Sequence, residues 1–229
     1  MSRKKSAEDS KKRRLELERK HRREIIVNVA EQAFIEHGYD ATMVDQLASE
    51  AGYTKATIYN YFDSKDDLFI AVLGRTYEKL FQTLQEMLGQ PNAKYELRTL
   101  GDAYLLFVDK FPGHTGFFDS GKIGPAIMNI ISKEQTKQPL TESESEFRLH
   151  QLRVQELMMN VITQTMREAG VEGRVDPFSV IMALSSLNSA IRELVMRGKS
   201  DHESGEKTRE YLAVLFNIID QGLKHYDEN

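Results

Sequence analysis

Apolar residues recur at helical spacing along most of the chain. Between residues 25 and 34 they fall at i, i+1, i+4, i+5, i+8 and i+9, and residues 68–88 continue a similar stripe. This period is typical of an α-helix that buries one face. No segment has the strict alternation of a half-buried strand. The pattern predicts an all-α protein of about nine helices.

Glycine, proline and capping residues divide this pattern into separate helices. Gly38 and Gly198 follow apolar stripes, and Asp176-Pro177 combines an N-cap with a proline at the first helical position. We predict helices over about residues 21–37, 43–51, 55–62, 64–89, 93–111, 126–134, 146–169, 177–197 and 205–225. A short helix is also expected within the glycine-rich segment 113–124.

Residues 42–65 have the spacing of two short helices joined by a tight turn. The first helix carries apolar residues at i, i+3, i+4 and i+7, and Thr42 is expected to cap it, with Asp45 completing a shortened capping box. Gly52 supplies the turn, and Ile58 points back toward the first helix. This arrangement predicts a helix-turn-helix, whose second helix enters the major groove of DNA.

The second helix has the surface chemistry expected of a DNA-reading helix. Thr54 is placed as its N-cap, and no acidic residue occurs between Lys55 and Phe62. Lysine, hydroxyl and amide groups bind phosphate oxygens and base edges. The residues left on its solvent side are Lys55, Ala56, Thr57, Tyr59 and Asn60.

The stretch from Ile25 to Leu68 resembles the DNA-binding domain of the TetR/AcrR family of bacterial transcriptional regulators. The resemblance is carried by the helix that ends in His37-Gly38-Tyr39, by Thr42, by the pairs Leu47-Ala48 and Ala51-Gly52, and by the block from Thr57 to Phe62 with Ser64-Lys65. It covers about a fifth of the chain. The chain departs from the family pattern at Asn60, where histidine is common, and at Tyr53, where valine or isoleucine is common.

The resemblance implies a double-stranded DNA operator as a partner. Lys55, Thr57, Tyr59 and Asn60 would contact the operator, while Thr42, Thr54 and Lys65 would mainly contact phosphates. Ala56 lies on the same face of the helix. Lys65 opens the next helix, where a cation is unfavourable unless an anion lies nearby, and a DNA phosphate would supply that anion.

The charge is distributed unevenly. The chain of 229 residues has a net charge of -4, yet residues 1–24 hold eleven Lys and Arg against five acids. A basic N-terminal end on an acidic remainder indicates a nucleic-acid contact at that end. We predict a flexible basic arm over residues 1–20, disordered or partly helical, that tracks DNA; the alternative is a solvated tail.

The region after residue 67 is predicted to bind an effector and to form a homodimer. Small and apolar residues crowd the helices at about 177–197 and 205–225, and the resemblance implies a four-helix dimer interface there. Phenylalanine and methionine suit an adaptable apolar cavity, although such stripes also form ordinary cores. The candidate pocket residues are Phe107, Phe111, Phe117, Phe118, Ile127, Met128, Met158 and Ile162.

Several kinds of site are not supported by the sequence. Cysteine is absent, so disulfides and thiolate chemistry are excluded, and the six histidines have no zinc-type spacing. Residues 121–124 lack the phosphate-loop frame, and Glu142, Glu144 and Glu146 are interpreted as a solvated run. We expect no catalytic residue, metal or cofactor, and no membrane segment.

These observations predict a cytoplasmic, homodimeric regulator that binds a palindromic operator, with a repressor released by an apolar or amphipathic effector as the leading form. Its expected parts are the arm (1–20), the helix-turn-helix domain (21–67) and the effector and dimerisation domain (68–229). One alternative is an architectural or division-linked DNA-binding protein that acts through a protein partner. An enzyme is a remote alternative, because no catalytic constellation is present.

Overall fold

The computed structural model describes residues 2–89, 97–118 and 120–184, together with residues 210, 214, 217–219, 221 and 222. Within these residues the fold is all-α and contains no strand, as predicted. The helices are α1 (Ser2–Ala41), α2 (Val44–Glu50), α3 (Lys55–Tyr59), α4 (Lys65–Leu88), α5 (Leu97–Lys110), the 3-10 helix η1 (Pro112–His114), α6 (Thr115–Phe118), α7 (Ile123–Gln135) and α8 (Glu142–Glu168). A further helix begins at residue 177 and continues to residue 184.

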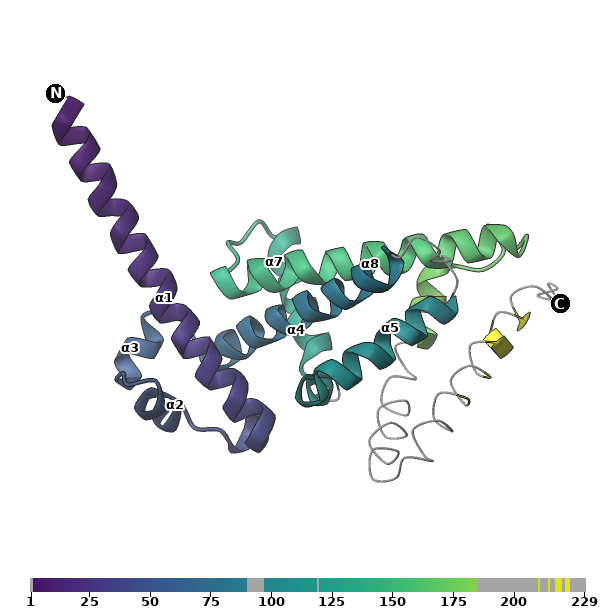
Figure 1. The fold of residues 1–229 in the computed structure, drawn as a ribbon, viewed down its shortest axis with the longest axis horizontal. Coiled ribbons are helices and arrows are strands. Elements are labelled where there is room, and N and C mark those ends of the chain that lie inside the picture. Colours follow the sequence, from purple (N-terminus) through teal and green to yellow (C-terminus); the bar gives the residue numbers. More distant parts are fainter. Residues whose placement is uncertain are drawn as a thin grey trace.

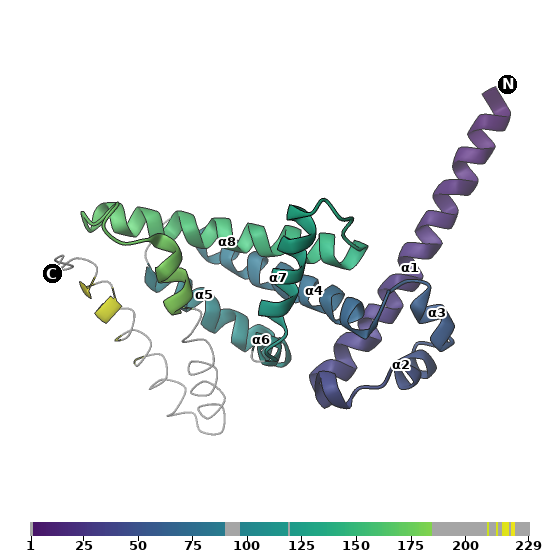
Figure 2. The ribbon, with the colours of Figure 1, turned by 180° about the vertical axis from the view of Figure 1, so that it is seen from behind.

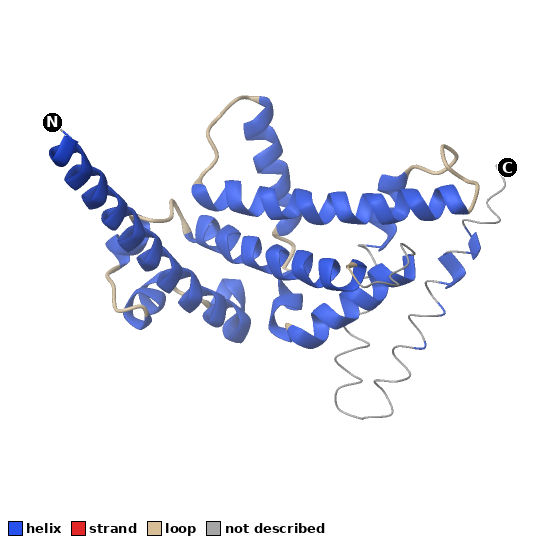
Figure 3. Ribbon diagram, turned by 45° about the horizontal axis from the view of Figure 1, so that its top comes forward, coloured by secondary structure: helices blue, strands red, loops and turns tan. Residues whose placement is uncertain are grey.

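The helices form a small N-terminal module joined to a longer body. Helices α1, α2 and α3 surround the start of α4, which then runs into the body with α8 along its side (Figures 1 and 2). Helix α5 packs against α4, and α7 crosses near the first turns of α8 (Figure 3). Helix α4 therefore belongs to both parts of the molecule.

Two apolar clusters lie in the described part of the chain. The first joins α1, α2 and α3 to residues 68–73 of α4, and also takes in Phe117, Ile130 and Phe147 from the body. The second joins the far end of α4 to α5 and to the second half of α8. The first turns of α4 thus complete the N-terminal core, and we define the N-terminal module as residues 21–73.

Helix α1 is much longer than predicted. The sequence predicts a disordered or partly helical arm over residues 1–20 and a helix from about residue 21, whereas the structure continues the helix back to Ser2. Lysine, arginine, glutamate and leucine are good helix formers, and Arg14 pairs with Glu18 one turn later at 3.8 Å. Residues 8–22 are exposed and project from the molecule (Figure 1). The predicted break at Gly38 is confirmed, because its φ is +79°.

Helix α8 begins four residues earlier than predicted. Thr141 caps it by accepting a hydrogen bond from the Glu144 backbone N–H at 3.1 Å. In return, the Glu144 carboxylate accepts from the Thr141 N–H at 3.0 Å. This is a capping box, and the spacing Thr-x-x-Glu signals it in the sequence. All three glutamates of the predicted solvated run are therefore helical; Glu142 and Glu146 are exposed as predicted, whereas Glu144 is buried.

The predicted dimerisation helices lie mostly outside the described residues. The start of the first one is confirmed, since the Asp176 carboxylate accepts hydrogen bonds from the Phe178 and Ser179 N–H groups at 3.3 and 3.0 Å. Those bonds, and the hydroxyl of Ser179, hold the pKa of the Asp176 carboxyl below its usual value.

Candidate nucleic-acid interface

Helices α2 and α3 form the tight turn that the sequence predicts. Gly52 adopts a φ of +72°, and the next N–H, that of Tyr53, donates to the Ala48 carbonyl at 2.8 Å. Because L-residues rarely adopt positive φ, glycine suits this turn. Ile58 and Phe62 are both buried in the N-terminal core and fix the orientation of α3.

Helix α3 is shorter than the predicted range of residues 55–62. Thr54 is its N-cap, as predicted, and its hydroxyl accepts a hydrogen bond from the Thr57 N–H at 3.1 Å. The helix ends at Tyr59, with Asn60 as its C-cap. The turn that follows carries Phe62 back to the core, which explains the early end.

The structure leaves most of the predicted contact residues on the surface of α3. Lys55, Ala56, Tyr59 and Asn60 are exposed, and Tyr59 keeps 44% of its surface accessible. Thr57 is half-buried. These side chains therefore form an exposed face with one cation, one phenol and one amide, and it contains no acid from α3 itself.

Lys55 is held by a neighbouring helix. Its ammonium lies 2.8 Å from a carboxylate oxygen of Asp45 on α2, and both side chains are exposed. The hydrogen bond to Asp45 raises the pKa of Lys55 above its usual value. A surface ion pair of this kind contributes little to stability. A phosphate can therefore replace Asp45 as the partner of Lys55 at small cost.

Thr42 does not fit its predicted role. Its side chain is only 2% exposed, and its hydroxyl donates to the carbonyl oxygens of Gly38 and Ala33 at 2.7 and 3.3 Å. Helix α2 is capped at Met43, whose N–H donates to the Gln46 side chain at 3.4 Å. The predictions that Thr42 caps α2 and contacts phosphate through its hydroxyl are therefore wrong. The hydroxyl ties the end of α1 to the start of α2.

Lys65 opens α4, as predicted, and Ser64 caps that helix by accepting from the Asp67 N–H at 3.0 Å. The ammonium of Lys65 lies 4.2 Å from the centre of the Tyr39 ring. Burial raises the pKa of Tyr39, and so does the hydrogen bond that the Tyr39 hydroxyl donates to Asp66 at 2.6 Å. The ring therefore stays neutral and supports the Lys65 cation at the edge of the module.

The structure divides the predicted pocket residues among separate groups. Phe107 is fully buried, and its ring lies 5.6 Å from Phe111 and 5.9 Å from Phe118. Phe117 and Ile127 instead belong to the N-terminal core, whereas Met158 and Ile162 belong to the second cluster. Met128 is 66% exposed, so its predicted place in a pocket is wrong: it lies on the outer side of α7.

Tyr77 is an aromatic residue that the prediction did not include. Its ring makes edge contacts with Phe118 at 5.8 Å and Phe147 at 5.3 Å, so it joins the Phe107 group to the N-terminal core. Burial raises the pKa of Tyr77 to about 12. We call Tyr77, Phe107, Phe111 and Phe118 the aromatic cluster. Its signal in the sequence was the apolar stripe of α4, which alone cannot separate a core residue from a pocket residue.

Other kinds of site are not seen in the described part of the chain. No group of three or more histidine or carboxylate side chains there is arranged to hold a metal ion. A search of the same residues also finds no helix with the length and apolar character needed to span a bilayer. The three-helix module with its exposed α3 face defines a helix-turn-helix DNA-binding protein.

Comparisons with known proteins give the family. Residues 26–72 match the model described as bacterial regulatory proteins, tetR family, and this range nearly coincides with the N-terminal module. The transcriptional activator FasR of Mycolicibacterium smegmatis is 31% identical over 94 residues, 41% of this chain and 43% of that protein. The transcriptional repressor BepR of Brucella suis is 38% identical over 63 residues, 28% of this chain and 30% of that protein. The matches thus span less than half of either relative.

The fold of most of the chain is also shared with solved structures. A tetR family transcription regulator from Shewanella sp. PV-4 aligns with a TM-score of 0.60 over 85% of this chain and 95% of that chain, at 14% identity. The fatty acid degradation regulator FadR from Bacillus halodurans aligns with a TM-score of 0.53 over 88% and 93%, at 19% identity. Residues 26–72 thus carry the DNA-binding domain of the tetR family, and the described chain has the helical fold of solved tetR family regulators.

Proposed function

We propose that this protein is a homodimeric regulator that binds a palindromic operator through α3 and leaves it when a small effector binds the body. The observation that carries the proposal is the exposed face of α3. This face presents Lys55, Tyr59 and Asn60, and α3 contains no acidic residue. Such a face suits a polyanion with readable base edges. Release by effector requires unequal effector affinity for the bound and released conformations.

Exposed apolar side chains support a homodimer through the last two helices. Phe178 and Met182 are about half exposed, although they lie on a helix whose other side is buried. The buried residues on that side are Val180, Ile181 and Leu184. Val214 and Ile218, in the second predicted interface helix, are 56% and 61% exposed. Large apolar residues in such numbers on neighbouring helices favour an interface between proteins. A two-fold pair would set the α3 helices about one DNA turn apart, ~34–36 Å.

The aromatic cluster supports an apolar or amphipathic effector. Tyr77, Phe107 and Phe118 come from α4, α5 and α6, so a ligand between them would touch three helices at once. Acyl compounds are the first class to screen, because the fatty acid metabolism regulator protein of Bacillus subtilis is 31% identical to this chain over 65 residues. The ammonium of Lys79 lies 5.7 Å from the Phe111 ring but pairs with Glu31, so an acidic head group would compete with that carboxylate.

The exposed first half of α1 supports an additional contact to DNA that flanks the operator. Residues 8–22 carry seven Lys and Arg against four acids, and their helix projects away from the body on the side of α3 (Figure 1). A rigid basic helix can neutralise phosphates beyond the bases that α3 reads. This contact would add affinity without sequence preference.

The test is selection of DNA from a random duplex pool, followed by titration of the selected site at several salt concentrations. We expect an inverted repeat, bound with a steep dependence on salt, and a dimer in sedimentation. A chain that lacks residues 2–18 should select the same sequence but bind it with a shallower salt dependence. Failure to enrich any sequence would contradict the operator and favour an architectural DNA-binding protein.

A further inference from the structure

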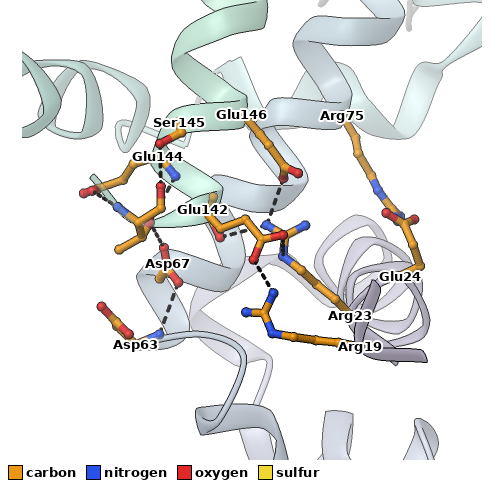
Figure 4. A network of polar contacts seen from close by, with 12 residues as sticks. Arg19, Arg23, Glu24, Asp63, Asp67, Arg75, Glu142, Glu144, Ser145 and Glu146 are labelled. Atoms are coloured by element: carbon orange, nitrogen blue, oxygen red, sulfur yellow. Dashed lines mark hydrogen bonds and ion pairs between the residues drawn. The ribbon is translucent and has the colours of Figure 1, made fainter. Parts of the chain in front are cut away.

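The first turn of α8 meets the N-terminal module through a cluster of ion pairs. Arg23 of α1 is only 4% exposed, and its guanidinium lies 2.8 Å from Glu146 and 3.6 Å from Glu142. The same guanidinium donates to the Ser143 hydroxyl at 3.2 Å. Arg19, one turn earlier, donates to Glu142 at 2.9 Å. Figure 4 shows both arginines reaching from α1 toward the carboxylates of α8.

The same arginines touch the segment that follows the recognition helix α3. Arg23 lies over the ring of Phe62, 5.2 Å from its centre, and Arg19 lies 5.7 Å from the centre of the Tyr61 ring. Each arginine therefore has one side on the segment that follows α3 and the other on α8. A cation between a ring and a carboxylate is held by both partners.

A second connection reaches the same segment from the other side. The hydroxyl of Thr141, the N-cap of α8, donates to Asp67 of α4 at 2.6 Å. Asp67 in turn accepts a hydrogen bond from the Asp63 N–H at 3.1 Å (Figure 4). Residues 61–63 are thus tied to the first turn of α8 through two separate routes, one through α1 and one through α4.

Helix α8 is able to carry a displacement from the body to this junction. It has 27 residues and is therefore about 40 Å long at 1.5 Å per residue. Its second half packs into the cluster that it shares with α5 and the far end of α4. A rearrangement in that cluster would move the first turn of α8 as one piece with it.

We infer that Arg23, with Glu142 and Glu146, is a positioning element: these residues let α8 set the placement of the recognition helix, independently of the covalent link through α4. This goes beyond the proposed function, which does not say how the body acts on α3. It rests on the proposed operator binding only for the second of the two measurements below.

The first measurement is amide hydrogen exchange in the full chain without DNA. Substituting Glu142→Gln together with Glu146→Gln removes both carboxylates of the junction but leaves α8 capped by Thr141 and Glu144. We expect exchange in residues 55–64 to quicken about tenfold, while exchange in α5 and the second half of α8 is unchanged. The matched control is Glu134→Gln, which removes the bidentate partner of Arg148 inside the body and should leave residues 55–64 unaffected.

The second measurement is affinity for the selected operator. Losing two negative charges near DNA would by itself tighten binding, so electrostatics alone predicts the opposite sign. We expect about tenfold weaker operator binding with unweakened binding to unrelated duplexes, because fewer molecules hold α3 correctly. Arg23→Met retains an apolar contact with Phe62 and should weaken operator binding to the same extent as the double glutamate variant. Adding Arg23→Met to that double variant should weaken binding no further.

The outcomes separate this inference from the proposed function. Unchanged exchange in residues 55–64, an equal rise throughout the chain, or unaltered operator affinity would each overturn the positioning role. If the unmodified protein selects no operator, the proposed function fails, and the exchange measurement still decides whether α8 positions α3.

Discussion

The N-terminal module and the aromatic cluster are both packed around phenylalanine and tyrosine side chains, but their sequences constrain their roles to different degrees. In the module, a glycine with positive φ, an N-cap threonine and the buried Ile58 lie within seven residues and fix one geometry. In the aromatic cluster, side chains from three helices meet across long sequence separations. Local spacing therefore identifies the first site, while the second depends on tertiary packing.

Burial alone does not separate a pocket from a core. Phe62 and Phe107 are both almost completely buried, yet Phe62 has a defined structural role between Arg23 and the module core. The ring of Phe107 packs against those of Tyr104, Phe111 and Phe118, as expected both for a core residue and for the wall of a ligand site. Energetic measurements can distinguish the two.

The largest expected effect comes from truncating these two phenylalanines. Phe62→Ala should lower the free energy of unfolding of the module by about 3–5 kcal/mol, since it leaves a cavity in a close-packed core. Phe107→Ala should cost less than about 3 kcal/mol if its ring borders a ligand space, because fewer contacts are lost there. Denaturant unfolding of both variants, followed by circular dichroism, measures the pair. Equal costs would assign Phe107 to the core and move the effector site elsewhere.

A smaller effect is expected at the buried carboxylate of Glu31, where α1 meets the body. Burial alone would raise its pKa, but hydrogen bonds from His114, Lys79 and Arg75 outweigh burial and hold it well below the usual 4.5. We expect Glu31→Gln to cost roughly 2–3 kcal/mol at neutral pH, less than a fully buried pair because Lys79 and Arg75 are partly exposed.

The pH dependence of stability follows from the sign of this shift. Because the folded pKa of Glu31 is depressed, its contribution is complete above the unfolded value of 4.5 and is lost as the pH falls below it. The wild-type and Glu31→Gln stabilities should therefore converge between about pH 4.5 and the acid limit of folding. Thermal unfolding at a series of pH values tests this. A difference that stays constant with pH would contradict the role of the charge, and Glu50→Gln on the surface of α2 serves as the control.

The parts that the sequence predicted are those where neighbouring residues determine the geometry. Thr54 and Gly52 act within one or two turns of their own position, and each has the predicted role. Thr42 failed because its threonine hydroxyl finds carbonyl acceptors on α1, which spacing within α2 does not reveal. The ion pairs of the α8 carboxylates were not predicted for the same reason. Glu142 and Glu146 face arginines about 120 residues earlier, a distance no local pattern reports.

Within α3, Tyr59→Ala tests the exposed side of the short helix whose other side is buried in the core. Tyr59 is exposed next to the buried Ile58, so its loss should leave the module folded. We expect operator binding to weaken by about 1–3 kcal/mol, the range of a good base contact, with the dimer intact in sedimentation. Tyr59→Phe separates the hydroxyl from the ring. Unchanged operator binding by both variants would remove Tyr59 from the interface.

The smallest expected effect is at Lys65, whose cation lies over Tyr39 at the edge of the module. If that ammonium meets a phosphate, Lys65→Ala should weaken binding to all DNA sequences about equally and lower the slope of log K against log salt by roughly 1. Lys110→Ala in α5 removes the same charge from an ion pair with Glu86 in the body and should leave the slope unchanged. A change in base preference at constant slope would instead make Lys65 part of sequence reading. Because Tyr39 and Asp66 hold each other whether or not Lys65 is present, neither result is explained by collapse of the module.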